Sequence, residues 1–235
     1  MSGGLYVEAR FRTSGDRVLL VEYGDAIDLR INEKVRDITA LLRKDVPAGV
    51  QLVLPAYRSL AVMYDPVVTT PVKLQALLRG LEERLDEADL PAPRTVEIPV
   101  CYGGEFGPDI QQVADHNGLD IQEVIAIHSA QPYHIYTIGF APGFCYLGGL
   151  DRRLHTPRLA TPRVSVAAGS VGIAEAQTGI YPLDSPGGWR LIGRTPLKLF
   201  DARRPAPFFY QTGDSLRFVA ISSQDYRRIQ EKDGI

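Results

Sequence analysis

The stretch 163-RVSVAAGSVGIAEAQTGIYPLDSPGGWRLIGRTPLKLF-200 decides the fold of this protein. Short apolar runs alternate in it with glycine and proline, and helical spacing is absent. The same pattern starts near residue 131 and continues to residue 221, with strands expected at 134–140, 163–171, 172–181, 189–193, 196–200 and 215–221. Evenly spaced short strands separated by turn residues predict a closed barrel or a sandwich. We favour a barrel because the segment has so many turns.

The first 90 residues mix strand and helix patterns. Strands are expected at 17–23, 50–54 and 59–64, and a helix at 32–44. A second helix is expected in 69-TTPVKLQALLRGLEERL-85, where Thr70 can cap the helix and Pro71 suits its first position. Its leucines form one apolar stripe, which is typical of a helix facing a core. The order β-α-β-β-α predicts a compact α+β module.

A segment rich in proline, alanine and charge, 87-EADLPAPRT-95, separates the two patterns. We therefore predict a boundary near residues 88–95, with a small α+β domain at 1–90 and a mainly-β barrel domain at 91–235. Two short helices are expected at the start of the second domain. One ends at Gly118 and the other is capped by Asp120.

Composition restricts the class of function. The 235 residues carry a formal net charge of -2 without a long block of like charge, which argues against a nucleic-acid or anionic-membrane binder. No run approaches the roughly 18 apolar residues that span a bilayer, and the start lacks a signal-peptide core, so we expect a cytoplasmic protein. Cys101 and Cys145 are expected to be reduced thiols. The four histidines lack zinc-binding spacing, so no metal is expected.

Three glycine- and proline-rich clusters predict a rigid pocket: 139–150, 156–172 and 181–196. The first, GFAPGFCYLGGL, suits neither a helix nor an ordinary strand. The alternative is that these residues only form the corners of the barrel. The candidate pocket or interface residues are Phe140, Pro142, Gly143, Phe144, Tyr146, Gly169, Ser170, Gly187, Gly188 and Trp189.

Arginines beside these clusters are candidate anion-binding groups. Arg158 and Arg163 each follow a proline, and a guanidinium presents paired donors to a carboxylate or phosphate. Arg194 with Thr195 is a similar candidate. Surface salt bridges are the alternative role for these arginines.

Two further residues, Gln177 and Tyr181, are expected on one strand face and are candidates for substrate binding. Trp189, the only tryptophan, would either stack on a flat ligand or close the barrel.

Three residues are candidates for proton transfer: His128, Glu105 and Asp109. A half-buried structural role is the alternative for His128, and helix capping is the alternative for Asp109. The sequence has no GxxxxGK[ST] motif and no GxGxxG after a strand, so any ATP site would be non-standard.

Five long motifs together resemble one known family: IPVCYGGEFGPDI (98–110), IGFAPGFCYLGGL (138–150), TPRLATPR (156–163), AAGSVGIAEAQTGIYPLDSPGGWRLIGRTPLKLFD (167–201) and TGDSLRFVAI (212–221). They resemble the KipI/PxpB family, which is also called allophanate hydrolase subunit 1, and the resemblance runs from about residue 6 to about residue 225. One departure is visible, because Ala167 stands where the family commonly has proline.

The resemblance implies a small α+β domain followed by a cyclophilin-like β-barrel. It also implies the B subunit of an ATP-dependent 5-oxoprolinase, a cyclic amide hydrolase that opens 5-oxoproline to L-glutamate and whose B subunit is inactive without its partners. The implied partners are one subunit of the PxpA or LamB/YcsF kind and one of the KipA/PxpC kind. The implied co-substrate is ATP, and the first glycine-rich cluster could instead be the docking surface for the PxpC-like partner.

Two alternatives accompany this interpretation. Some relatives inhibit a sporulation histidine kinase, which would make this chain a regulatory binding protein. Others form part of an allophanate hydrolase or urea carboxylase. Neither alternative involves nucleic acid or a membrane.

Overall fold

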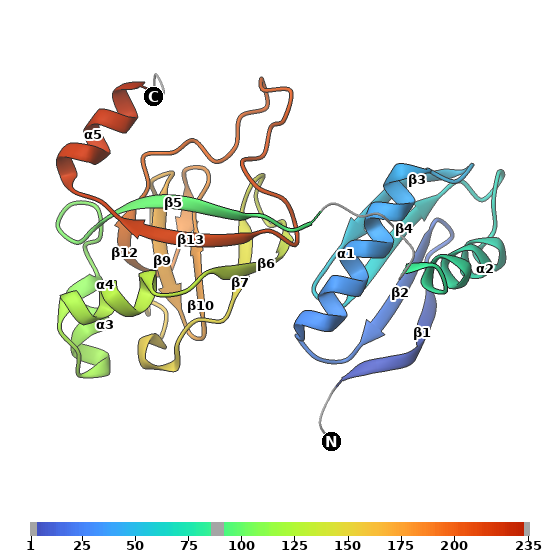
Figure 1. Cartoon of the computed structure of the whole chain (residues 1–235), viewed down its shortest axis with the longest axis horizontal. Helices are drawn as coiled ribbons and strands as arrows, with labels where there is room; N and C mark the ends of the chain where they lie inside the picture. Colours follow the sequence, from blue (N-terminus) through green and yellow to red (C-terminus); the bar gives the residue numbers. More distant parts are fainter. Residues whose placement is uncertain (1–3, 86–91, 233–235) are drawn as a thin grey trace. The chain divides into compact units, whose positions relative to one another are not determined.

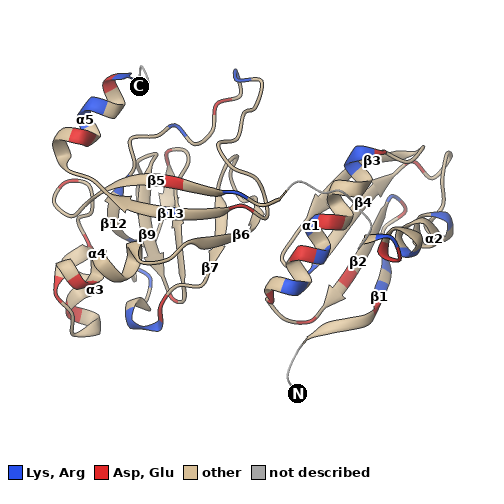
Figure 2. Ribbon diagram, in the orientation of Figure 1, with Lys and Arg blue, Asp and Glu red and all other residues tan. Residues whose placement is uncertain are grey.

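The computed structural model describes residues 4–85 and 92–232, and contacts divide the chain into two compact units, residues 1–92 and 93–235 (Figure 1). The predicted boundary segment, 88–95, lies partly outside the described residues. Basic and acidic residues are interspersed along the described ribbon of both units (Figure 2).

The N-terminal unit is a four-stranded antiparallel sheet in the order β1-β2-β4-β3. Its elements are β1 (Leu5–Ser14), β2 (Val18–Gly24), α1 (Leu29–Lys44), β3 (Val50–Pro55), β4 (Ser59–Tyr64) and α2 (Pro71–Glu82). Alternate strand residues such as Leu19, Val21 and Val62 share a buried cluster with Val35 of α1 and Leu78 of α2. Both helices therefore pack on the same face of the sheet.

Helix α2 forms where the sequence predicts it. The side chain of Thr70 accepts a hydrogen bond from the backbone of Lys73 at 3.4 Å, which is a typical N-cap. Leu74 and Leu78 are buried, whereas Leu77 is exposed, so the stripe that meets the core is narrower than predicted. Strand β1, at the edge of the sheet, was not predicted.

The C-terminal unit contains a seven-stranded mixed sheet in the order β10-β9-β12-β5-β13-β6-β7. Strands β13 and β5 are parallel, and β10 at one end of the sheet contacts β7 at the other, which makes a nearly closed barrel. The prediction of a barrel is therefore correct. The elements are β5 (Thr95–Tyr102), α3 (Ile110–Asn117), α4 (Ile121–Ser129), β6 (Tyr133–Ile138), β7 (Cys145–Gly148), the 3-10 helix η2 (Arg152–Leu154), β8 (Arg163–Val166), β9 (Ser170–Ala174), β10 (Gln177–Ile180), β11 (Ser185–Gly187), β12 (Arg190–Arg194), β13 (Ser215–Ala220) and α5 (Ser223–Lys232).

Several predicted elements differ in detail. The cluster at 139–150 contains strand β7, so the expectation that it avoids an ordinary strand was wrong for its second half. The predicted strand 163–171 is divided by a turn at Gly169, whose φ of 83° favours glycine. Residues 172–181 form a hairpin of β9 and β10. Residues 196–200 contribute only the isolated bridge of Phe200 to Phe208, and α5 was not predicted.

One apolar cluster fills the barrel and carries α3 and α4 at its surface. It includes Val113, Val124, Ile135 and Cys145, all of which are buried. Burial raises the pKa of the Cys145 thiol to about 11, so this cysteine is protonated and packs as an apolar group. Outside this core, a smaller cluster around Phe144, Tyr181 and Trp189 leads to the candidate site.

Candidate functional site

A pocket of about 210 Å³ opens on the barrel where the loops before β7, around β11 and before β12 meet. We call it the aromatic pocket. It is lined by Phe140, Phe144, Tyr146, Arg158, Gln177, Tyr181, Pro186, Gly187, Gly188 and Trp189. Nine of these ten residues are among the nineteen predicted site residues, so the structure brings about half of the predicted residues together in one pocket. Pro186 was missed, although it lies beside the predicted Gly187.

Phe144 is the centre of the aromatic wall. Its ring centroid lies 5.1 Å from that of Tyr146, 5.8 Å from that of Trp189 and 6.1 Å from that of Tyr181, each in edge-on geometry. Such edge-to-face pairs are favourable beyond the area they bury, so the wall is rigid. Phe140 also meets Phe144 edge-on, but its side chain is 76% exposed at the rim of the pocket.

Two glycines allow the backbone to approach these rings. A Cβ added at Gly187 would lie 2.3 Å from the Tyr181 hydroxyl oxygen, so any side chain there would force Tyr181 to move. Gly143 has a φ of 84°, and an added Cβ would lie 3.0 Å from Cβ of Phe200. The Tyr210 hydroxyl also donates to the Gly143 carbonyl at 2.6 Å, which fixes the turn before β7.

The polar groups of the aromatic pocket are few. Arg158 is exposed at its edge, and Gln177 lies on β10 with Tyr181 directly after that strand. Burial raises the pKa of the Tyr181 phenol, although the nearby Arg158 and Arg163 act in the opposite direction. The pocket therefore offers a cation, an amide and a protonated phenol against flat apolar walls.

Arg163 does not line the pocket, because it forms an ion pair with Asp109. Its Nη2 donates to Asp109 Oδ1 at 2.7 Å, and its Nη1 donates to the Trp189 carbonyl at 3.4 Å. The other carboxylate oxygen of Asp109 accepts from the Leu191 backbone at 2.7 Å. Arg163 and Asp109 thus hold the start of β12 and the adjacent Trp189 in place.

This arrangement changes the interpretation of Asp109. The residue stands at the N-cap position of α3, but its carboxylate is directed at Arg163 and Leu191 and not at the helix. It is buried, and its oxygens are occupied by these two donors. The geometry thus favours neither capping nor proton transfer, and gives Asp109 a bracing role.

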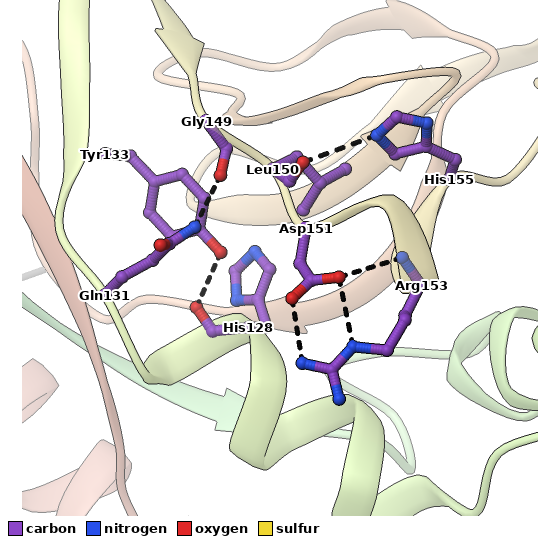
Figure 3. Close-up of polar contacts among 8 residues, drawn as sticks. All are labelled: His128, Gln131, Tyr133, Gly149, Leu150, Asp151, Arg153 and His155. Carbon is purple, nitrogen blue, oxygen red and sulfur yellow. Dashed lines mark hydrogen bonds and ion pairs between the residues drawn. The ribbon is translucent and has the colours of Figure 1, made fainter.

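His128 is fully buried beneath the barrel wall, stacked on Phe218 at 4.5 Å. Its Nδ1 lies 2.8 Å from the Tyr102 hydroxyl and its Nε2 lies 2.7 Å from Thr178 Oγ1. Thr178 Oγ1 also lies 3.1 Å from the Gly172 carbonyl, and when its hydroxyl donates there, Nε2 carries the imidazole proton and Nδ1 accepts from Tyr102. The backbone is held as well, since the Tyr133 hydroxyl donates to the His128 carbonyl at 2.9 Å (Figure 3).

Burial also lowers the pKa of His128 to about 3, so the ring is neutral. Both ring nitrogens are already bonded within the core, which agrees with the structural alternative for this residue. Glu105 lies elsewhere again, on the exposed surface, with an oxygen 3.9 Å from Nη2 of Arg227. In the described chain, none of the three candidates for proton transfer lines the aromatic pocket.

Arg194 and Thr195 belong to a different cavity, of about 270 Å³, which we call the basic pocket. It is lined by Ala168, Pro182, Leu183, Arg194, Thr195, Pro196, Leu197, Lys198, Phe200, Asp201, Arg203, Arg204, Tyr226 and Gln230. Gly169 and Ser170 are not among its lining residues, but the Thr195 amide donates to the Gly169 carbonyl at 2.9 Å and Ser170 pairs with Arg194 between β9 and β12. Pro142 is exposed and is outside the described lining of both pockets.

Residues 4–85 and 92–232 contain no group of three or more His, Cys, Asp or Glu side chains that could hold a metal ion. None of the helices in these two ranges is long and apolar enough to cross a membrane.

Comparison with known proteins assigns the family. Residues 9–210 match the model of the carboxyltransferase domain, subdomain C and D. The chain is 43% identical over 230 residues to the 5-oxoprolinase B subunit of Bacillus subtilis (strain 168), and this match covers 93% of the chain and 95% of the relative. The chain belongs to the family of 5-oxoprolinase B subunits. The B subunit of Escherichia coli O157:H7 is 41% identical over 211 residues, which is 90% of this chain and 95% of that one.

Solved structures agree with this family. The crystal structure of TTHA0988 superimposes with a TM-score of 0.78 at 36% identity, covering 88% of this chain and 40% of the longer chain. The urea amidolyase of Kluyveromyces lactis superimposes with a TM-score of 0.69 at 22% identity over 95% of this chain and 15% of that enzyme, which shows a shared fold.

Proposed function

We propose that this chain is the B subunit of a cytoplasmic, ATP-dependent 5-oxoprolinase that opens 5-oxoproline to L-glutamate together with PxpA-like and PxpC-like subunits. The near-complete match to the 5-oxoprolinase B subunit of Bacillus subtilis carries the proposal. We further propose that the barrel is cyclophilin-like and that the chain is inactive alone. The urea amidolyase matches fit the urea-carboxylase alternative only distantly, since the solved enzyme is 22% identical to this chain.

The aromatic pocket suits 5-oxoproline in size and chemistry. The substrate is a five-membered lactam with one carboxylate, and a volume of about 210 Å³ is smaller than the roughly 300–1,000 Å³ of sites for larger ligands. Trp189 and Phe144 provide faces and edges for the ring, Arg158 can pair with the carboxylate, and Gln177 can bond the lactam amide. These roles would orient the substrate without moving a proton.

The activating step needs a phosphoryl donor. In the proposed reaction, ATP transfers its terminal phosphoryl group to the lactam oxygen and leaves as ADP. One water then attacks the lactam carbonyl carbon, and the C–N bond breaks as the nitrogen takes a proton, which gives γ-glutamyl phosphate. A second water cleaves this acyl phosphate into glutamate and inorganic phosphate. The aromatic pocket does not fit a triphosphate, because Arg158 is the only cation among its lining residues. We therefore assign this pocket to the lactam and not to ATP.

The test is ATP-dependent glutamate release by this chain mixed with its PxpA-like and PxpC-like partners, with each component omitted in turn. We expect turnover to vanish when this chain is absent, and Arg158→Gln to raise the KM for 5-oxoproline. Arg152→Gln is the matched control, because Arg152 is also an exposed arginine but does not line the pocket. Absence of turnover in a folded, assembled mixture would contradict the proposal.

A further inference from the structure

The basic pocket concentrates positively charged side chains. Four of its lining residues are cations, namely Arg194, Lys198, Arg203 and Arg204, and only Asp201 carries a negative charge. Three of these cations and the aspartate lie on the loop that follows β12, whereas Arg194 ends that strand. The lining also includes Tyr226 and Gln230 of α5. An excess of three positive charges around one cavity favours an anionic ligand.

Asp201 organises two of the cations. Its oxygens accept from Nε and Nη2 of Arg203, each at 3.0 Å, and from Lys198 Nζ at 2.9 Å. Hydrogen bonds from Arg203 and Lys198 hold the pKa of this carboxyl well below its usual range, so it remains ionised. This single carboxylate is shared by two cations, so their positive charge is only partly compensated.

The other two arginines, Arg194 and Arg204, each use only one hydrogen-bond donor within the part of the chain that the structure describes. Arg194 donates from Nε to the Ala168 carbonyl at 2.9 Å, and Arg204 donates from Nη1 to the Lys198 carbonyl at 3.4 Å. Among the hydrogen bonds of the described residues, no partner takes up the two terminal nitrogens of Arg194 or Nη2 of Arg204. Both guanidinium groups therefore keep donors that can bind the oxygens of a ligand.

We propose that the basic pocket binds a phosphoryl group. Phosphate carries more charge and presents more oxygens than a carboxylate, which matches several convergent guanidinium and ammonium donors. A volume of about 270 Å³ accommodates one or two phosphoryl groups, and the rest of any larger ligand would extend to solvent. Free phosphate and the terminal phosphates of a nucleotide share this chemistry.

This inference is independent of the proposed lactam site. The two pockets share no lining residue, so ligand binding by the isolated chain and glutamate release by the complex can fail separately. A phosphoryl site here would also give this chain a role in handling phosphate that the aromatic pocket does not supply.

The test is calorimetric titration of the full chain with inorganic phosphate, then with ATP, at constant ionic strength. We expect saturable phosphate binding that Arg204→Gln weakens by about tenfold, the usual effect of losing one charge-assisted hydrogen bond. Arg204→Gln leaves the bonds of Asp201 to Arg203 and Lys198 in place, so the loop should keep its shape. Arg152→Gln, an exposed arginine outside the pocket, should bind as the wild type does.

The outcomes separate the possible ligands. Phosphate binding that ATP displaces, with both weakened by Arg204→Gln, supports a nucleotide phosphate. Phosphate binding that ATP does not displace supports free phosphate. The proposal is overturned if neither ligand binds saturably, if acetate binds as tightly as phosphate, or if Arg204→Gln and Arg152→Gln behave alike.

Discussion

The buried His128 should make the barrel sensitive to acid. Its pKa is about 3 in the folded chain, whereas an unperturbed histidine has a pKa of about 6.5. A group with a depressed folded pKa stabilises the protein above its unfolded pKa, and this contribution is lost as the pH falls from about 6.5 toward about 3. At pH 5 the histidine is therefore protonated in the unfolded chain and neutral in the folded chain.

The size of the effect follows from that difference. Each pKa unit corresponds to about 1.36 kcal/mol, and pH 5 lies about 1.5 units below the unfolded pKa, so the loss relative to pH 7.5 is about 2 kcal/mol. Urea denaturation at pH 7.5 and pH 5 measures it. Fluorescence of Trp189, the only tryptophan, reports on the barrel unit alone.

The decisive comparison is between variants. His128→Gln should lose stability at pH 7.5, because two core hydrogen bonds are disturbed, but its further loss at pH 5 should be about 2 kcal/mol smaller than that of the wild type. His116→Gln is the control, since His116 is exposed and should leave the pH dependence unchanged. If His128→Gln and the wild type lose the same free energy on acidification, the assignment of a buried neutral imidazole is refuted.

Tyr102→Phe removes one hydrogen bond and keeps the titrating ring, so it should retain the full pH dependence even if His128→Gln does not fold.

Three other substitutions test the site. Asp109→Asn should lower the barrel's unfolding free energy by about 3 kcal/mol, because it weakens a largely buried ion pair, and a urea midpoint equal to that of the wild type would contradict the bracing role. Phe144→Ala should cost about 3 kcal/mol and abolish ATP-dependent glutamate release by the assembled enzyme, so unchanged turnover would exclude it as a pocket wall. Gly187→Ala should displace Tyr181 and raise the KM for 5-oxoproline, while Gly80→Ala, at an open helical position, should not; equal KM values would argue against the close approach.

Local patterns were sufficient to predict most of the fold. Helix α2 could be predicted because Thr70, a proline and spaced leucines act within one segment. Strand β1 was missed because it is an edge strand with seven of its ten residues exposed, and only the short run around Ala9 and Phe11 alternates with charged residues. Strand β7 was hidden for another reason, since the glycines and prolines around it indicate turns and its pairing with β6 is set by tertiary structure.

The candidate site, like the fold, could be predicted only in part from the sequence. Composition located the aromatic pocket, because its glycines and aromatic residues are clustered in the sequence. Composition did not reveal that Arg163 is paired with Asp109, 54 positions away, or that Arg194 lies in a separate cavity from Arg158. Long-range partners decide whether an arginine is available to a ligand, and spacing along the chain does not report them.

The positions of the titratable groups separate structural roles from substrate binding. His128 and Asp109, the two buried groups best suited to proton transfer, are both fully engaged in holding the barrel and the Trp189 wall. The lining of the aromatic pocket contains no histidine and no carboxylate. Within the described chain, its residues can therefore orient a lactam, but they include no side chain of the usual general-base kind. Hydrolysis requires a base to activate water. With the aromatic pocket assigned to the lactam as proposed, this base would have to come from outside the pocket's lining residues.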